Sequence, residues 1–99
     1  MVKINWTNLA VEDLKSVFDY ISRDSFRYAK IQISRLNSRT QILKTLPNAG
    51  KVVPEFENEK LRELIEGNYR IIYKVVNTSK IDILTIHNSA KDLTERSIE

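Results

Sequence analysis

The segment over residues 61–76 constrains the fold more than any other part of the chain. Apolar and polar residues alternate with a period of two on both sides of Gly67-Asn68, and this alternation is typical of β-strands. A Gly-Asn pair between two such runs favours a tight turn. The segment therefore predicts a β-hairpin with strands over about 61–65 and 69–76.

The same hairpin places one arginine on each strand, Arg62 and Arg70. An arginine within a strand loses hydration unless it pairs with an acid or faces a wet, concave surface. Two interpretations stay open at this point. Either the hairpin builds an anion-binding face, or its arginines form ion pairs with acidic neighbours such as Glu55, Glu63 or Glu66.

The rest of the chain predicts two helices and two further strands. Alternation over residues 2–6 predicts a first strand, and apolar residues at helical spacing then predict two helices that end near Ser22 and Leu46. Residues 51–59 are expected to form a polar loop, and residues 81–87 a fourth strand. The last twelve residues are expected to form a short helix or to fray.

This order of elements is β-α-α-β-β-β, and it predicts one α+β domain over residues 1–99. Helices followed by a run of strands favour a helical hairpin packed on one face of an antiparallel sheet. The odd-numbered residues from Tyr69 to Val75 would then lie under the helices. Arg70 and Lys74 would lie together on the opposite face, which we expect to be less well covered.

Composition and charge exclude several classes of protein. No apolar run approaches the roughly 18–20 residues of a membrane helix, and the N-terminus has no signal-peptide pattern, so we expect a cytoplasmic protein without membrane contact. The chain has no cysteine and one histidine, so we expect no disulfide, no metal site and no cofactor. The net charge of +3 permits an acidic or nucleic-acid partner without requiring one.

Five residues are candidates for chemistry on a phosphate. Arg70, Lys60 and Arg62 would hold a phosphate if all three lie on one face, because arginine offers a planar fork for two oxygens. His87 would transfer protons near neutral pH, and Glu55 would act as a base. The alternative is that all five are structural, since a lone histidine is usually structural and a glutamate in a polar loop is usually solvated.

The second predicted helix is strongly basic. A solvated helix face is the simpler interpretation, and a surface for an acidic protein partner or a nucleic acid is the alternative. Only Asp24 opposes the basic residues, which are Arg23, Arg27, Lys30, Arg35, Arg39 and Lys44.

Taken together, these pieces resemble the RelE/ParE superfamily of type II toxin–antitoxin toxins, and most of all its ParE branch. The resemblance covers nearly the whole chain and rests on the order and spacing of short motifs. These are Ala10 with Asp13-Leu14 and Tyr20-Ile21, Leu46-Pro47 with Gly50, Val53-Pro54-Glu55, Arg62-Glu63-Leu64, Gly67, and Tyr69-Arg70-Ile71-Ile72-Tyr73.

The resemblance implies a cognate antitoxin bound to the toxin in a hetero-oligomer, and growth arrest when the toxin is free. RelE-like members cleave mRNA on the ribosome, whereas ParE-like members inhibit DNA gyrase. In the nuclease branch, strand arginines and lysines stabilise the scissile phosphate. Arg70 matches the third-strand arginine of that set, and Lys60 and Arg62 match its second-strand basic pair.

The chain departs from the nuclease pattern after the fourth strand. Many relatives carry a histidine, two small residues and an arginine there, whereas this chain has Asn88-Ser89-Ala90-Lys91. His87 lies one position earlier, and a shift of one residue on a strand points a side chain to the other face. No tyrosine follows Tyr73 to match the C-terminal catalytic tyrosine of some nucleases. These departures favour gyrase inhibition over mRNA cleavage.

Overall fold

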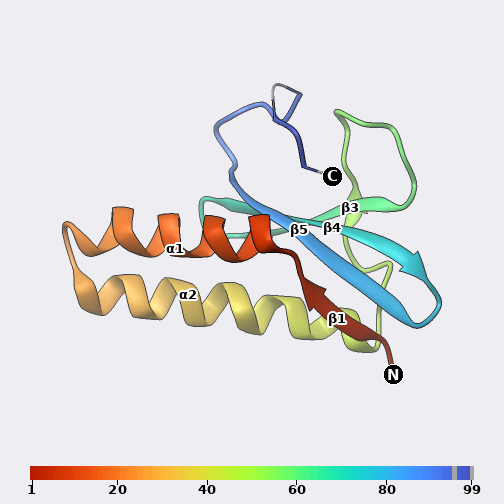
Figure 1. Cartoon of the computed structure of the whole chain (residues 1–99), viewed down its shortest axis with the longest axis horizontal. Coiled ribbons are helices and arrows are strands. Elements are labelled where there is room, and N and C mark those ends of the chain that lie inside the picture. The colour runs from red at the N-terminus through yellow and green to blue at the C-terminus, as the bar shows by residue number, and fades with distance from the viewer. Residues whose placement is uncertain (95, 99) are drawn as a thin grey trace.

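The fold consists of a helical hairpin and a five-stranded sheet, seen in a computed structural model that describes residues 1–94 and 96–98. The two helices lie side by side along one side of the sheet (Figure 1). The strand order is β1-β5-β4-β3-β2. The predicted α+β fold is therefore confirmed. The elements are β1 (Lys3–Trp6), α1 (Asn8–Ser22), α2 (Phe26–Thr40), the 3-10 helix η1 (Gln41–Lys44), β2 (Lys51–Val52), β3 (Leu61–Glu66), β4 (Tyr69–Asn77) and β5 (Lys80–Asn88).

Both helices begin at a side chain that caps them. The Thr7 hydroxyl accepts a hydrogen bond from the Ala10 N–H at 3.2 Å, and the Ser25 hydroxyl accepts one from the Tyr28 N–H at 3.0 Å. Such caps satisfy backbone donors that have no partner within the first turn of a helix. They fix where each helix starts, and three residues separate the end of α1 from the start of α2.

Two features of the sheet differ from the sequence prediction. β1 pairs with β5 in parallel, with Ile4 opposite Ile81, so the sheet is mostly and not wholly antiparallel. A parallel pair needs a long crossover connection, and the chain between β1 and β5 supplies one. β2 lies within the segment that we expected to be a loop, and its two residues are too few to show a period in the sequence.

The turn at Gly67-Asn68 sets the register of the central hairpin. Gly67 has a φ of 59°, as at the first central position of a type II′ turn, where glycine is favoured because it has no Cβ. Glu66 therefore lies opposite Tyr69, and Arg62 lies opposite Tyr73. The turn thus decides which face of the sheet each side chain occupies.

Each face of the sheet has its own hydrophobic core. The first lies under the helices and contains Leu36, Ile71 and Tyr73. The second lies on the opposite face and consists of Val53, Leu61, Ile72, Leu84, Leu93 and Ile98, with Phe56 packed against it.

The expectation that this second face is poorly covered was wrong. The segment after β2 and the segment after β5 both lie across it (Figure 1). The described part of the C-terminal segment forms neither a helix nor a strand, yet Leu93 is fully buried and Ile98 is 8% exposed. Its apolar side chains hold it against the sheet. The prediction for residues 95 and 99 lies outside the described residues.

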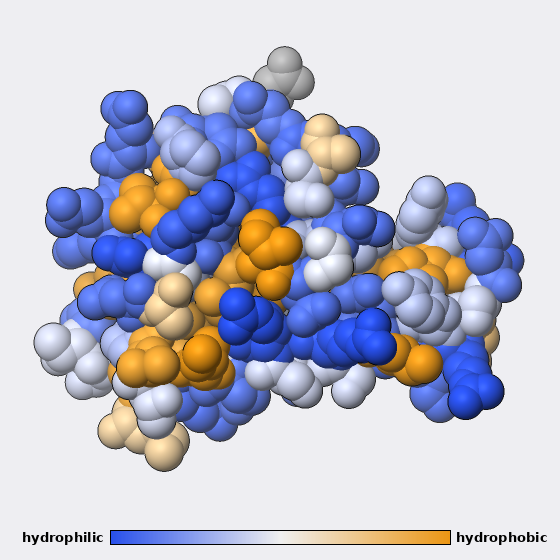
Figure 2. All heavy atoms as spheres, turned by 180° about the vertical axis from the view of Figure 1, so that it is seen from behind, coloured by the Kyte–Doolittle hydropathy of each residue, from blue (hydrophilic) through white to orange (hydrophobic). Residues whose placement is uncertain are grey.

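The outer surface carries several large apolar side chains. On the side opposite the view of Figure 1, apolar residues gather in separate groups between hydrophilic ones, and one group lies at the tip of the helical hairpin (Figure 2). In the described part of the chain, no helix has both the length and the apolar character needed to cross a membrane. The exposed apolar residues of the two helices, of η1 and of β3 are Val11, Tyr20, Phe26, Tyr28, Ile31, Ile42 and Ile65.

Candidate functional site

The sheet separates the basic candidate residues onto two faces. Arg70 lies opposite His87 on β5 and opposite Ile65 on β3. Arg62 lies opposite Tyr73, so its side chain points to the helix side. Lys60 precedes Arg62 by two residues, and both side chains line a hollow between the loop before β2 and the far end of β4. The hypothesis that the three form one basic face was therefore wrong, because the register places Arg70 on the other side.

Arg70 is held by two carboxylates on the second face. Its Nη1 and Nη2 donate to the two oxygens of Glu55 at 2.6 and 2.8 Å, and Nη2 also donates to Glu63 at 2.6 Å. The Arg70 side chain is only 9% exposed and that of Glu63 only 4%. Of the two interpretations, ion pairing is the confirmed one for Arg70, and the expectation that this arginine is exposed was wrong.

The ion pairs also decide what Glu55 can do. The hydrogen bonds from Arg70 lower the pKa of Glu55 from 4.5 to about 2, and the backbone N–H of Leu93 adds a weaker bond at 3.3 Å. The pKa of Arg70 is raised in turn, chiefly by its hydrogen bonds to Glu55. A carboxylate with so low a pKa is a poor proton acceptor at neutral pH. The cluster of Arg70, Glu55 and Glu63 also carries one more negative than positive charge, so it disfavours a phosphate.

His87 is buried next to this cluster, and both of its ring nitrogens are engaged. Nε2 lies 3.0 Å from the carbonyl of Lys91, and Nδ1 lies 3.2 Å from Nη1 of Arg96. A carbonyl only accepts and a guanidinium only donates, so Nε2 carries the proton and Nδ1 accepts. The ring is 6% exposed. It therefore offers neither a free lone pair nor a free donor to a substrate.

Asp13 connects α1 to β5 and to the C-terminal segment, and sequence analysis missed this role. Its Oδ1 forms an ion pair with Arg96. Its Oδ2 accepts hydrogen bonds from the Thr85 hydroxyl and from the Ile86 N–H, the latter at 3.2 Å. β1 pairs with β5 only as far as Ile83, so the N–H of Ile86 lies beyond the edge strand and takes a side-chain partner from α1. No local pattern signals this contact, which depends on the strand order.

Arg62 has a different environment from Arg70. Its Nη1 donates to the carbonyl of Gly50 at 2.9 Å. The Tyr73 hydroxyl accepts from the Gly50 N–H and donates to the Pro47 carbonyl, both at 2.9 Å. A Cβ at position 50 would lie 2.7 Å from that hydroxyl, so only glycine permits this close approach. Arg62 and Tyr73 thus fasten the loop before β2 to the sheet.

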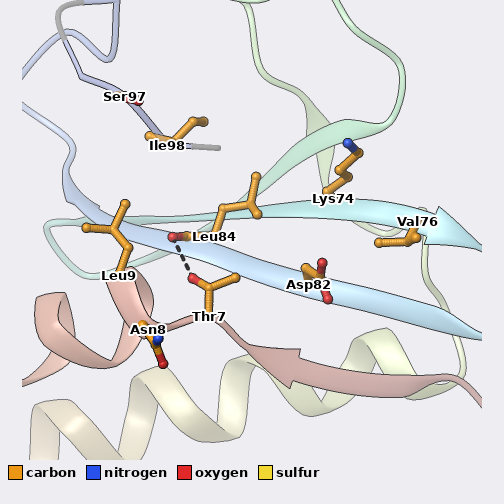
Figure 3. Close-up of a pocket in the computed structure, with 9 residues that line it drawn as sticks. All are labelled: Thr7, Asn8, Leu9, Lys74, Val76, Asp82, Leu84, Ser97 and Ile98. Carbon is orange, nitrogen blue, oxygen red and sulfur yellow. Dashed lines mark hydrogen bonds between the residues drawn. The ribbon is translucent and has the colours of Figure 1, made fainter.

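A hollow of about 570 Å³ lies on the second face, between the start of α1, β4, β5 and the C-terminal segment (Figure 3). Ile98 and Leu84 form apolar walls, and the Thr7 hydroxyl donates to the Leu84 carbonyl at 3.1 Å. None of the five candidate residues lines it. Among the described residues, no three histidine, cysteine or acidic side chains are grouped to hold a metal ion. The lining residues are Thr7, Asn8, Leu9, Lys74, Val76, Asp82, Leu84, Ser97 and Ile98.

Comparison with known proteins identifies the family. The sequence profile described as "ParE toxin of type II toxin-antitoxin system, parDE" matches residues 4–93. The chain therefore belongs to the ParE family of type II toxin–antitoxin toxins, and a system of that kind includes an antitoxin as partner. The resemblance to the ParE branch is confirmed.

Solved structures support the same fold. A chain of the "Chromosomal ParDE TA system from P. aeruginosa" superposes with a TM-score of 0.72 at 23% identity, over 89% of this chain and 96% of that chain. A search of curated protein sequences finds no match.

Proposed function

We propose that this ParE-family toxin arrests growth in the cytoplasm by inhibiting DNA gyrase, and that a cognate antitoxin holds it inactive in a hetero-oligomer. The observation that carries the choice of target is the pairing of Arg70 with two carboxylates. A nuclease needs this arginine for a phosphate, and here it is neutralised and nearly covered. Inhibition by binding needs a shaped surface and no proton transfer.

The other candidate groups for cleavage support the same choice. Glu55 is held ionised by Arg70, and His87 has both nitrogens engaged. The alternative function is a RelE-like, ribosome-dependent mRNA endonuclease. It would have to build its phosphate site from Lys60 and Arg62 alone, on the face away from His87. That separation argues against a shared reaction centre.

The helical hairpin offers a surface for a protein partner. Tyr20 on α1 and Tyr28 on α2 are 68% and 49% exposed, and Tyr69 at the start of β4 lies near both. Burial, and then the neighbouring phenols of Tyr20 and Tyr28, raise the pKa of Tyr69. Exposed groups of apolar and aromatic side chains mark interaction sites. We expect the antitoxin to cover this part of the hairpin.

Two assays on the same toxin test the choice of target. The purified chain is added to gyrase with relaxed plasmid and ATP, and 5′ ends of ribosome-bound mRNA are mapped in cells arrested by its expression. We expect supercoiling to be inhibited in proportion to the toxin added, with no new codon-specific mRNA ends. Addition of the antitoxin before gyrase is the control and should restore supercoiling. New mRNA ends together with unimpaired supercoiling would replace the gyrase proposal with the nuclease alternative.

A further inference from the structure

A hollow of about 410 Å³ on the helix side of the sheet exposes Lys60 and Arg62. It lies where the loop before β2 meets the far end of β4. Pro47 and Asn48 form one wall, and the loop that carries them is fastened by Tyr73 and Arg62. The other lining residues are Glu59, Val75, Val76, Asn77 and Thr78. The hollow is therefore a rigid feature that combines apolar walls with two cations.

Arg62 has no acidic partner within residues 1–94 and 96–98. Neither Arg62 nor Lys60 takes part in an ion pair of the described residues. One nitrogen of the Arg62 guanidinium binds the Gly50 carbonyl, and Nε is buried without a hydrogen-bond partner. Nη2 therefore remains for a ligand, and a guanidinium binds a carboxylate with particular strength.

The charge of the hollow fits a single carboxylate better than a nucleic acid. Glu59 lines the hollow beside Lys60 and Arg62, so its three charged side chains sum to +1. A polyanionic backbone would meet the Glu59 carboxylate as well as the two cations, and it gains little from the apolar walls of Pro47 and Val75. The side chain of a glutamate has both the charge and the short aliphatic stem that this lining suits.

We propose that the hollow binds one acidic side chain of the cognate antitoxin, with its carboxylate on Arg62 and Lys60 and its stem against Pro47 and Val75. This inference rests on the proposed function only in that it requires an antitoxin. It places a second contact of the antitoxin at the far end of the sheet, away from the aromatic residues of the hairpin tip. A partner that reaches both would lie along the length of the toxin.

The test compares two lysine substitutions of equal charge change. Lys60→Glu reverses the charge in the hollow, and Lys3→Glu makes the same change on β1, the edge strand beyond β5, where Lys3 does not line the hollow. Both lysines are exposed, so both variants should fold. Each is prepared with the protein encoded by the neighbouring gene as the probe, and affinity is measured by calorimetry. We expect Lys60→Glu to weaken binding by at least about tenfold, because like charges across an interface repel. Lys3→Glu should change affinity by less than about twofold.

Equal affinities for the two variants would overturn the inference. A second arm titrates both variants with single-stranded oligonucleotide, and loss of oligonucleotide binding in Lys60→Glu with unchanged antitoxin binding would also overturn it. Growth arrest is also measured in a bacterial host that expresses the unsubstituted chain without the antitoxin. If that chain causes no arrest, the proposed function fails. In another outcome, the unsubstituted chain causes arrest, and the protein of the neighbouring gene relieves the arrest by Lys60→Glu and by Lys3→Glu equally. In that case only the inference fails, and the proposed function stands.

Discussion

Arg62 and Arg70 lie on adjacent strands of one hairpin, and their surroundings are opposite in kind. Arg70 is buried on the second face, where Glu55 and Glu63 neutralise it. Arg62 lies on the helix side, binds one backbone carbonyl, and faces an open hollow. Two residues of the same type in the same hairpin therefore serve different purposes. Arg70 is paired with carboxylates of the fold itself, whereas Arg62 has no acidic partner among the described residues.

The difference follows from the register of the hairpin. A two-residue turn pairs Glu66 with Tyr69, and every further pair along the strands is then fixed. Arg62 falls opposite Tyr73, whereas Arg70 falls opposite Ile65. Because side chains alternate between faces, a change of one residue in the turn would have put both arginines on one side. A shift of one residue in the pairing of β3 with β4 would therefore have produced the anion-binding face that the sequence suggested.

The largest expected effect in this comparison is the loss of stability in Arg70→Met. Removal of the guanidinium leaves Glu55 and Glu63 without their cation, and breaking a buried ion pair by removing one partner costs about 3–5 kcal/mol. The free energy of unfolding is measured by urea denaturation at neutral pH. A loss below about 1 kcal/mol would mean that the cluster does not hold the fold.

The second test concerns the C-terminal segment, which covers the face of the sheet on which Arg70 lies. Leu93 is fully buried in the second core, so Leu93→Ala should leave a cavity and cost about 3 kcal/mol. Leu46→Ala is the matched control, since Leu46 is 56% exposed and its loss should cost little. Equal effects in thermal unfolding would show that the C-terminal segment does not pack on the sheet in solution.

The third test uses pH. The folded chain lowers the pKa of Glu55 from 4.5 to about 2, so the unfolded chain binds more protons between these values. The stabilisation is complete above about pH 5 and is lost as the pH falls toward 2, and it amounts to at most about 3 kcal/mol. Glu55→Gln removes this titration. The difference in unfolding free energy between native chain and variant should therefore shrink between pH 6 and pH 3, and a constant difference would contradict the lowered pKa.

The smallest expected effect is that of Arg62→Met, the matched counterpart of Arg70→Met. It removes one hydrogen bond to the Gly50 carbonyl, which is worth about 1 kcal/mol. Urea denaturation under the same conditions gives the comparison directly. If Arg62→Met proves as destabilising as Arg70→Met, the two arginines are both structural and the contrast between them disappears.

Much of the fold could be predicted from the sequence. The period of two in the hairpin, the helical spacing of apolar residues and the turn at Gly67-Asn68 gave the helices and the three long strands. The sequence also allowed a prediction of the face of the sheet on which Arg62 and Arg70 each lie, since a two-residue turn fixes which residues of the two strands pair. The short β2 could not be predicted, because a two-residue strand shows no period. The parallel pairing of β1 could not be predicted either, because strand order depends on tertiary packing.

The environment of the candidate residues was harder to predict. Glu55 lies in an irregular segment 15 residues before Arg70, and no local pattern says that its carboxylate reaches β4. Arg96 lies in a polar tail, yet it binds Asp13 and His87 because Leu93 and Ile98 draw the tail onto the sheet. These contacts depend on the second core, which forms only once three separate segments have packed together.

The central claim is that Arg70 supports the fold and takes no part in a reaction. It is tested most directly by neutralising its whole cluster, with Arg70→Met, Glu55→Gln and Glu63→Gln in one chain. Replacing a buried ion network by neutral groups of similar size often preserves folding, and circular dichroism and urea denaturation verify it here. We expect the folded triple variant to arrest growth within about twofold of the native toxin at equal expression. A triple variant that folds as the native chain does but no longer arrests growth would contradict the account.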